Sequence, residues 1–287
     1  MRLPFLSGRR CLSVHFQDTR RINDELLIRL TPYLTNLTHL YLVGCPKLTH
    51  EGVWSVISSS TRGIRGLGLE ALSTAFDMED LSQKCSKSNA LRQLRSITLT
   101  GPSQDVASTW ARQVVDLLSL SPLEMFHVST VGGEVGGVLN DDLCESIVLQ
   151  HGRNLRRFSV DRMGISTIAI ANICKGCPRL EQLFITAEQD NIDSLGSCLS
   201  HTRTLRSLHI KRPVGSGSDT APVVPQSQIL RLANQCGSEL QQIGCNTRVW
   251  QVRRDVRRAE DGSLSIERCL VSYELPEIPE QFLVVRS

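Results

Sequence analysis

The stretch TNLTHLYLVGCPKLTHEGVWSVISSS, residues 35–60, decides how this chain folds. It opens with the pattern Leu37-x-x-Leu40-x-Leu42, in which the last two leucines point to the same face of a short strand. Gly, Cys and Pro at 44–46 then interrupt the pattern, as is typical of a tight turn. Apolar residues at helical spacing follow at 53–57. The stretch therefore predicts one strand, one turn and one helix.

The same unit recurs along most of the chain. Further copies of the apolar pattern begin at Ile64, Leu94, Leu123, Leu155, Leu180, Leu205 and Leu240. A degenerate first copy has Leu12 and Val14 in the second and third apolar places. Successive copies begin 25 to 35 residues apart, and one strand plus one helix in such a period is typical of the leucine-rich repeat.

A lone repeat of this kind cannot bury its apolar face, so neighbouring repeats must stack on one another. We therefore expect an α/β fold: a leucine-rich-repeat solenoid, a ribonuclease-inhibitor-like horseshoe of about nine strand–helix repeats with a parallel, concave sheet. A doubly wound sheet of separate strand–helix–strand units is disfavoured by the even spacing. The solenoid is expected over 1–247. A C-terminal β-hairpin cap and tail are expected over 248–287, because Asp261-Gly262 is a strong hairpin turn signal.

Capping residues predict where the helices begin. Asn23, followed by two acidic residues, is expected to cap a helix over 24–34, and Thr49 the helix of the quoted stretch. Further helices are expected over 78–87 and 106–118, and the first strand over 11–16.

Composition restricts the class of protein. Of 287 residues, 40% are hydrophobic and 21% charged, which is typical of a soluble globular chain. No apolar run reaches the roughly 18 residues of a membrane span, and the N-terminal apolar stretch is too short for a secretory signal. We expect no membrane partner, and a net charge of +3 does not by itself indicate nucleic acid. The ten cysteines are scattered like small buried hydrophobes, so we expect a reducing compartment, cytoplasmic or nuclear.

Three features could carry chemistry, and each has a structural explanation. The loop at 131–137, VGGEVGG, lacks the Gly-Lys-Ser/Thr of a phosphate loop and is expected to be a connector, as is the Ser- and Pro-containing insertion at 212–226. Cys174-x-x-Cys177 has no second Cys or His pair, so we expect no metal and no cofactor. The arginines at 253–258 are diluted by nearby acids, which favours a cap over nucleic-acid contact.

We expect a non-catalytic chain, because no Ser/His/Asp, Cys/His or paired-carboxylate arrangement can be proposed from spacing. The alternatives left open are an enzyme that uses the glycine loop or the cysteines, and a nucleic-acid-associated repeat protein.

Binding residues are expected on the concave face. Two positions in each copy point away from the helices: the one between the last two apolar residues, and the one two places before it. Aromatic, Arg and Met side chains at such positions are favoured in protein interfaces. With the first copy aligned as above, Cys11 and Ser13 are expected beside His39 and Tyr41. The candidate protein-binding residues are His39, Tyr41, Thr98, Met125, His127, Arg157, Ser159, Gln182, Phe184 and His209.

The segments LTHLYLVGCPKLTHEGV (37–53) and ICKGCPRLEQLFI (173–185) resemble the cysteine-containing leucine-rich repeats of F-box proteins, a likeness that covers about residues 9 to 246. The ending, with WQVRRDV, EDGSLSIERCL and YELPEIPEQFLVVR, is similar to that of fungal, especially basidiomycete, F-box/leucine-rich-repeat proteins. The resemblance implies the substrate receptor of a Skp–cullin–F-box ubiquitin ligase, with the F-box on the Skp adaptor and the substrate on the concave face.

This chain departs from that family at its start. An F-box is a helical segment ahead of the repeats, whereas the first strand is expected near residue 11. A Skp contact is therefore expected only if an F-box lies upstream. We also expect the N-terminal edge to be covered by a partner or by a preceding segment, since an end repeat otherwise exposes its stacking face.

Overall fold

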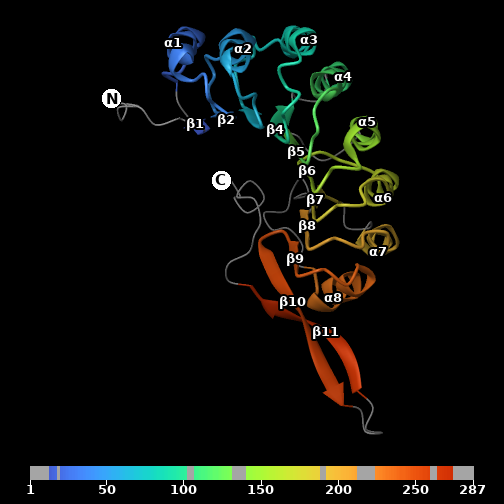
Figure 1. Ribbon diagram of the computed structural model, residues 1–287. Coiled ribbons are helices and arrows are strands. Elements are labelled where there is room, and N and C mark those ends of the chain that lie inside the picture. The colour runs from blue at the N-terminus through green and yellow to red at the C-terminus, as the bar shows by residue number, and fades with distance from the viewer. Residues whose placement is uncertain are drawn as a thin grey trace, which may run out of the picture. The chain divides into compact units, whose positions relative to one another are not determined.

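The computed structural model describes residues 13–17, 20–101, 107–130, 140–187, 192–211, 224–258 and 264–273 (Figure 1). The chain divides into two compact units, Met1–Gly132 and Gly133–Ser287. Several segments named above lie outside the described residues: residues 1–12, the glycine loop at 131–137, most of the insertion at 212–226, and the Asp261-Gly262 turn. Predictions about those segments therefore remain predictions.

The N-terminal unit alternates strands with helices. Its strands are β1 (Ser13–Gln17), β2 (His39–Val43), β3 (Gly66–Glu70), β4 (Ser96–Gly101) and β5 (Met125–Thr130). They pair in chain order, and every pair is parallel. The helices between them are α1 (Asp24–Leu30), η1 (Thr31–Tyr33), α2 (His50–Ser59), α3 (Met78–Ser88) and α4 (Ala107–Leu118). They form a row on one side of the strands, which leaves the opposite sheet face without helices (Figure 1).

The C-terminal unit continues the same alternation. Its parallel strands are β6 (Arg157–Asp161), β7 (Gln182–Thr186), β8 (Ser207–Lys211) and β9 (Gln242–Cys245). Its helices are α5 (Asp141–His151), α6 (Thr167–Gly176), α7 (Ile192–Leu199) and α8 (Gln226–Gln235). The unit ends in a long antiparallel hairpin of β10 (Arg248–Arg258) and β11 (Leu264–Ser272), in which β10 also pairs with β9.

The repeated apolar positions form the core. In the N-terminal unit, Leu40, Leu67, Ile97 and Phe126 are aligned across β2 to β5, and each is at most 1% exposed. In the C-terminal unit, Phe158, Leu183, Leu208 and Ile243 are aligned across β6 to β9 and are fully buried. The expected strand–helix alternation and the expected inward positions of these copies are therefore confirmed.

The first repeat was misaligned by the sequence pattern. In the structure Val14 and Phe16 lie beside Leu40 and Leu42, so they and not Leu12 and Val14 take the second and third apolar places. Ser13 accordingly lies beside His39, and His15 beside Tyr41. A shift of two residues keeps the same side chains on the same face, so alternation alone cannot detect the error.

The two expected helix caps are present. Asn23 Oδ1 accepts from the N–H of Leu26 at 3.0 Å, and Thr49 Oγ1 accepts from the N–H of Glu51 at 3.3 Å. The first helix is shorter than expected, because α1 ends at Leu30 and a 3-10 turn follows. Pro32 in that turn has no N–H to continue the α-helical ladder, which accounts for the change.

A carboxylate from one helix also binds the start of the next. Asp24 of α1 accepts three hydrogen bonds from the N-terminal end of α2: the Thr49 N–H at 2.9 Å, the Thr49 hydroxyl at 2.7 Å and the Gly52 N–H at 3.2 Å. In the C-terminal unit, Asp141 of α5 accepts from the Ser166 N–H at 2.9 Å and the Ser166 hydroxyl at 2.5 Å. These aspartates link consecutive repeats through their helix starts.

Candidate functional site

The ten candidate residues divide between the two units. His39, Tyr41, Thr98, Met125 and His127 lie on β2, β4 and β5 of the N-terminal unit. Arg157, Ser159, Gln182, Phe184 and His209 lie on β6, β7 and β8 of the C-terminal unit. Strand pairing places each set in two adjacent rows across its own sheet, as expected. The two rows of the N-terminal unit begin at His39 and Tyr41.

An aromatic cluster lies on the helix-free face of the N-terminal unit. The rings of His39 and Tyr41 are stacked with centroids 6.4 Å apart and an interplanar angle of 22°. The ring of His15 meets Tyr41 edge-on at 5.9 Å. His39 and Tyr41 are half-buried and His15 is exposed, so the cluster is partly open to solvent. We name His15, His39 and Tyr41 the aromatic cluster.

Two glycines of β3 create the space that this cluster occupies. A Cβ atom on Gly66 would lie 2.5 Å from Cδ2 of His39 and 2.7 Å from the Tyr41 hydroxyl. A Cβ atom on Gly68 would lie 2.5 Å from Cδ1 of Tyr41. Only a strand without side chains at these positions lets both rings lie across it. The glycines therefore leave the room in which both rings lie across β3.

The other candidate residues on this face differ from one another in chemical type and in solvent exposure. Partial burial raises the pKa of the Tyr41 hydroxyl, and a hydrogen bond with Ser96 partly offsets that effect. Thr98 is half-buried and Met125 is 36% exposed, whereas His127 is only 7% exposed. The face thus offers Tyr, His, Thr and Met side chains to a partner, and His127 contributes little of that surface.

The corresponding residues of the C-terminal unit are much less accessible. Ser159, Phe184 and His209 are fully buried, so these three candidate binding residues offer no exposed surface in the structure. Arg157 lies over the Phe184 ring, with its guanidinium carbon 5.8 Å from the centroid, and its Nε donates to Gln182 Oε1 at 2.5 Å. Strand alternation predicts on which face of the sheet a side chain lies, but it does not predict whether that face is covered. The burial of Ser159, Phe184 and His209 therefore could not be predicted from the sequence pattern.

His209 lies in an apolar and crowded setting. A Cβ atom on Gly244 of the neighbouring strand would lie 2.1 Å from its Nδ1, so the ring lies close over that glycine. Burial lowers the pKa of His209 to about 4, the Asn246 backbone hydrogen bond partly opposes this, and the nearby Lys211 lowers it further. His209 is therefore neutral at pH 7 and has a structural role in the sheet.

The cysteine pair that invites a metal interpretation is buried. Cys174 and Cys177 are free and buried, and burial raises the pKa of both thiols to about 12. The thiolate, which is the reactive form of cysteine, is therefore scarce for both groups at pH 7. Cys174 and Cys177 pack as small hydrophobic side chains of α6 and the turn after it.

A second group with metal-ligand residue types is His50, Glu51 and Asp80, whose ligand atoms lie within 4.8 Å of one another. The Asp77 N–H donates to His50 Nδ1 at 3.1 Å, so the ring proton must sit on Nε2, which faces Asp80 at 3.2 Å. Lys84 Nζ lies 2.7 Å from Asp80 and 2.8 Å from Glu51. The ammonium of Lys84 already supplies the cation for this group, so the arrangement is an ion-pair network.

The arginines of the hairpin are also engaged. Arg254 donates to the carbonyl of Ser238. Arg268 donates to the carbonyl of Ala233 in the last turn of α8 and to those of Cys236 and Gly237 just after it. Cations are favourable at such a helix terminus. Arg257 pairs with Glu267 at 3.1 Å. Arg254 and Arg268 thus hold the hairpin to its own unit, whereas the Arg257 ion pair lies within the hairpin.

Sequence reasoning missed His15, because the first copy was misaligned. The alternative spacing Val14-x-Phe16 was the available signal.

Among the described residues, no helix combines the length and apolar character needed to cross a membrane. In comparisons with known proteins, no family model matches the chain and no curated protein is significantly similar to it.

Proposed function

We propose that this chain is a non-catalytic protein-binding scaffold of the leucine-rich-repeat type. Its primary contact with a partner is the helix-free face of the N-terminal unit. The observation that carries the proposal is the aromatic cluster, laid across Gly66 and Gly68 and partly open to solvent. Rings that are already held in the bound arrangement lose little entropy on binding, which makes them effective contacts.

The residue types on this face favour a protein partner. Tyr and Met are enriched in protein interfaces, and Tyr is among the residues that most often dominate the binding energy. Met125 extends the apolar surface three strands beyond Tyr41, and Ser96 and Thr98 of β4 add hydroxyl groups between them. Such a surface suits an extended or helical segment of another protein.

The class of assembly follows from the resemblance described above. The cysteine-containing repeats suggest the substrate-recognition part of a Skp–cullin–F-box ubiquitin ligase receptor, located in the cytoplasm or nucleus. The alternative is an adaptor of the same fold that has no role in ubiquitination. The buried thiols of Cys174 and Cys177 are compatible with either assembly in a reducing compartment.

Site-specific photocrosslinking tests the proposed surface. A photoreactive phenylalanine analogue replaces Tyr41 in one version of the chain and Tyr33 in the control version, because Tyr33 is 71% exposed and lies on η1. We expect a protein partner to crosslink at position 41 and not at position 33. Partners equally crosslinked at both positions would argue against a binding face at Tyr41.

Binding measurements with the purified partner then give the energetic result. Tyr41→Ala should weaken binding by about tenfold or more, as is common for a central aromatic contact, and Tyr33→Ala should leave it unchanged. Unchanged affinity of a folded Tyr41→Ala protein would refute the proposal. Recovery of the Skp adaptor and a cullin in the same capture would favour the ligase, and recovery of neither would favour the adaptor.

A further inference from the structure

A repeated pair of arginines precedes two strands of the N-terminal unit. The segments are Arg62-Gly-Ile-Arg65 before β3 and Arg92-Gln-Leu-Arg95 before β4. Ile64 and Leu94 are fully buried, whereas the flanking arginines are exposed. Because β3 and β4 are adjacent and parallel, corresponding positions of the two segments lie side by side. The fold thus brings Arg62 and Arg92 to the same edge of the unit.

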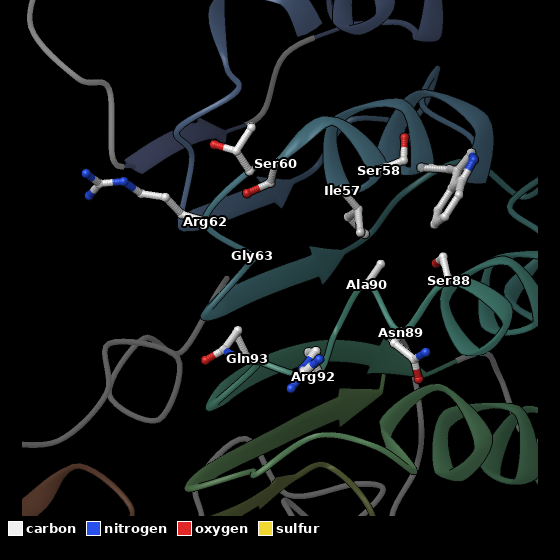
Figure 2. A pocket seen from close by; sticks show the side chains of 12 residues that line it. Ile57, Ser58, Ser60, Arg62, Gly63, Ser88, Asn89, Ala90, Arg92 and Gln93 are labelled. Atoms are coloured by element: carbon white, nitrogen blue, oxygen red, sulfur yellow. The ribbon is translucent and has the colours of Figure 1, made fainter.

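A pocket lies between these two segments. It has a volume of about 430 Å³, is open to solvent, and is bordered by residues of α2, the end of α3 and the loops that follow these helices (Figure 2). Trp54, Ile57 and Ala90 form an apolar part of its lining. Arg62, Arg92 and the amide side chains of Asn89 and Gln93 form a polar part. The pocket therefore combines hydrogen-bond donors with an apolar wall.

The positive charge at this pocket is not neutralised within the described residues. Among these residues, no carboxylate lies within ion-pair distance of Arg62 or Arg92, whereas Arg95 pairs with Glu124. The acidic side chains of α2 and α3 lie at the opposite ends of these helices, in their first turns. Arg62 and Arg92 both line the pocket, the Arg62 side chain extends away from the Arg92 side in Figure 2, and no acid of these helices opposes an incoming anion.

Other polar groups of the lining are occupied. The Ser60 hydroxyl donates to the Leu37 carbonyl at 2.7 Å, and the Thr61 hydroxyl donates to the Thr35 carbonyl at 2.9 Å. The Ser88 hydroxyl donates to the Lys84 carbonyl at 2.7 Å. A ligand would therefore be recognised by the guanidinium and amide groups, and these groups bind carboxylates and phosphates.

We propose that this pocket binds an anionic side chain, carboxylate or phosphate, of a protein segment whose neighbouring apolar residue packs on Trp54 and Ala90. Competition with an oligouridine probe distinguishes this occupant from a continuous nucleic-acid backbone. The site shares no residue with the aromatic cluster. Its test is therefore independent of the function proposed above.

Short peptides test the site directly. Three fluorescein-labelled peptides of sequence Ala-Leu-X-Leu-Ala, with X as phosphoserine, glutamate or serine, are titrated with the full chain and followed by fluorescence anisotropy. Trp54 emission provides a second signal, since Trp110 and Trp250 are each only 9% exposed. We expect the phosphoserine and glutamate peptides to bind and the serine peptide to bind about tenfold more weakly or worse. Binding of the phosphoserine peptide alone would identify phosphate as the recognised group.

Matched variants locate the binding. The double variant Arg62→Ala/Arg92→Ala should weaken binding of the anionic peptides by about tenfold or more. The control Arg153→Ala/Arg203→Ala changes exposed arginines of the same sequence pattern in the C-terminal unit and should have no effect. The proposal is overturned by equal binding of the serine peptide, by equal loss in both double variants, by an oligouridine probe that outcompetes the peptides, or by no binding at millimolar peptide.

Discussion

Removing the carboxylate of Asp24 should lower the stability of the N-terminal unit by an amount that can be worked out from its hydrogen bonds. This carboxylate accepts three hydrogen bonds, two from Thr49 and one from the Gly52 N–H, so Asp24→Ala would leave the start of α2 without its external acceptor. Hydrogen bonds to a charged group contribute roughly 1.5–3 kcal/mol each when buried, and less when the group is partly exposed. Asp24 is half-buried, and water can replace part of the lost bonding. We therefore expect a loss of about 2–4 kcal/mol in the free energy of unfolding of the N-terminal unit.

The same change in the C-terminal unit should have a smaller effect. Asp141 accepts two hydrogen bonds, both from Ser166, and Asp141→Ala should cost about 1–3 kcal/mol. Glu25 and Asp142 provide matched controls. Each is exposed and lies in the first turn of the same helix, so Glu25→Ala and Asp142→Ala remove a similar charge without the interhelix bonds. Each control should cost well under about 1 kcal/mol, the usual range for the helix dipole.

Urea unfolding and amide hydrogen exchange together measure these effects. Exchange should accelerate most at the amides of Thr49 and Gly52 in Asp24→Ala, because those N–H groups lose their acceptor directly. Asp24→Asn keeps one acceptor oxygen and should fall between the wild type and the alanine variant. The reasoning would be refuted if Asp24→Ala and Glu25→Ala lost the same stability, or if exchange at Thr49 and Gly52 did not change.

Three further predictions concern the sheet and the thiols. Gly68→Ala should displace the Tyr41 ring, because the added Cβ would lie 2.5 Å from Cδ1 of that ring. We expect the free energy of unfolding to fall by about 1–3 kcal/mol and the near-UV circular dichroism to change. A Thr98→Ala control should show neither effect. His209 has its pKa lowered to about 4 in the folded chain, so its contribution to stability should be complete above about pH 6.5 and decline as the pH falls toward 4. Urea unfolding at pH 7.5 and 5 should show a decline that His209→Leu reduces, and an equal decline in that variant would contradict the assignment. Cys174 and Cys177 should resist alkylation at pH 8 until the chain is unfolded and should bind no stoichiometric zinc; rapid labelling of the folded chain or one equivalent of zinc would contradict this.

Much of the fold could be predicted because the same physical requirement recurs in every repeat. Leu40, Leu67 and Ile97 must each be buried, and their constant place in the pattern fixes both the strand and its inward face. The first strand was misplaced because Leu12 and Val14 fit the same alternation as Val14 and Phe16. Pairing with β2 decides between the two alignments, and that pairing is a property of the folded sheet.

The candidate site was predicted less well for a different reason. Tyr41 and Phe184 occupy equivalent positions in their repeats, yet Tyr41 is half-buried and Phe184 fully buried. The sequence pattern assigns both to the same face. Their accessibility depends on what surrounds each of them, such as the glycines beside Tyr41 and the guanidinium of Arg157 against Phe184. The repeat alignment places Gly68 beside Tyr41, but it does not show how far either ring is covered.

Arg62 and Arg92 have two candidate roles at the pocket, which are stabilising a helix end and binding a ligand. Arg62 and Arg92 both follow the C-terminal end of a helix, where a cation is favourable, and this alone could explain why arginine occurs there. That interaction contributes only about 0.3–1 kcal/mol per residue at an exposed position. Arg62→Ala/Arg92→Ala should therefore remain folded with a modest loss of stability. Because binding of an anionic peptide should fall by about tenfold or more in the same variant, the two roles give different results in one protein preparation. A loss of stability without a loss of peptide binding would assign these arginines to the helices alone.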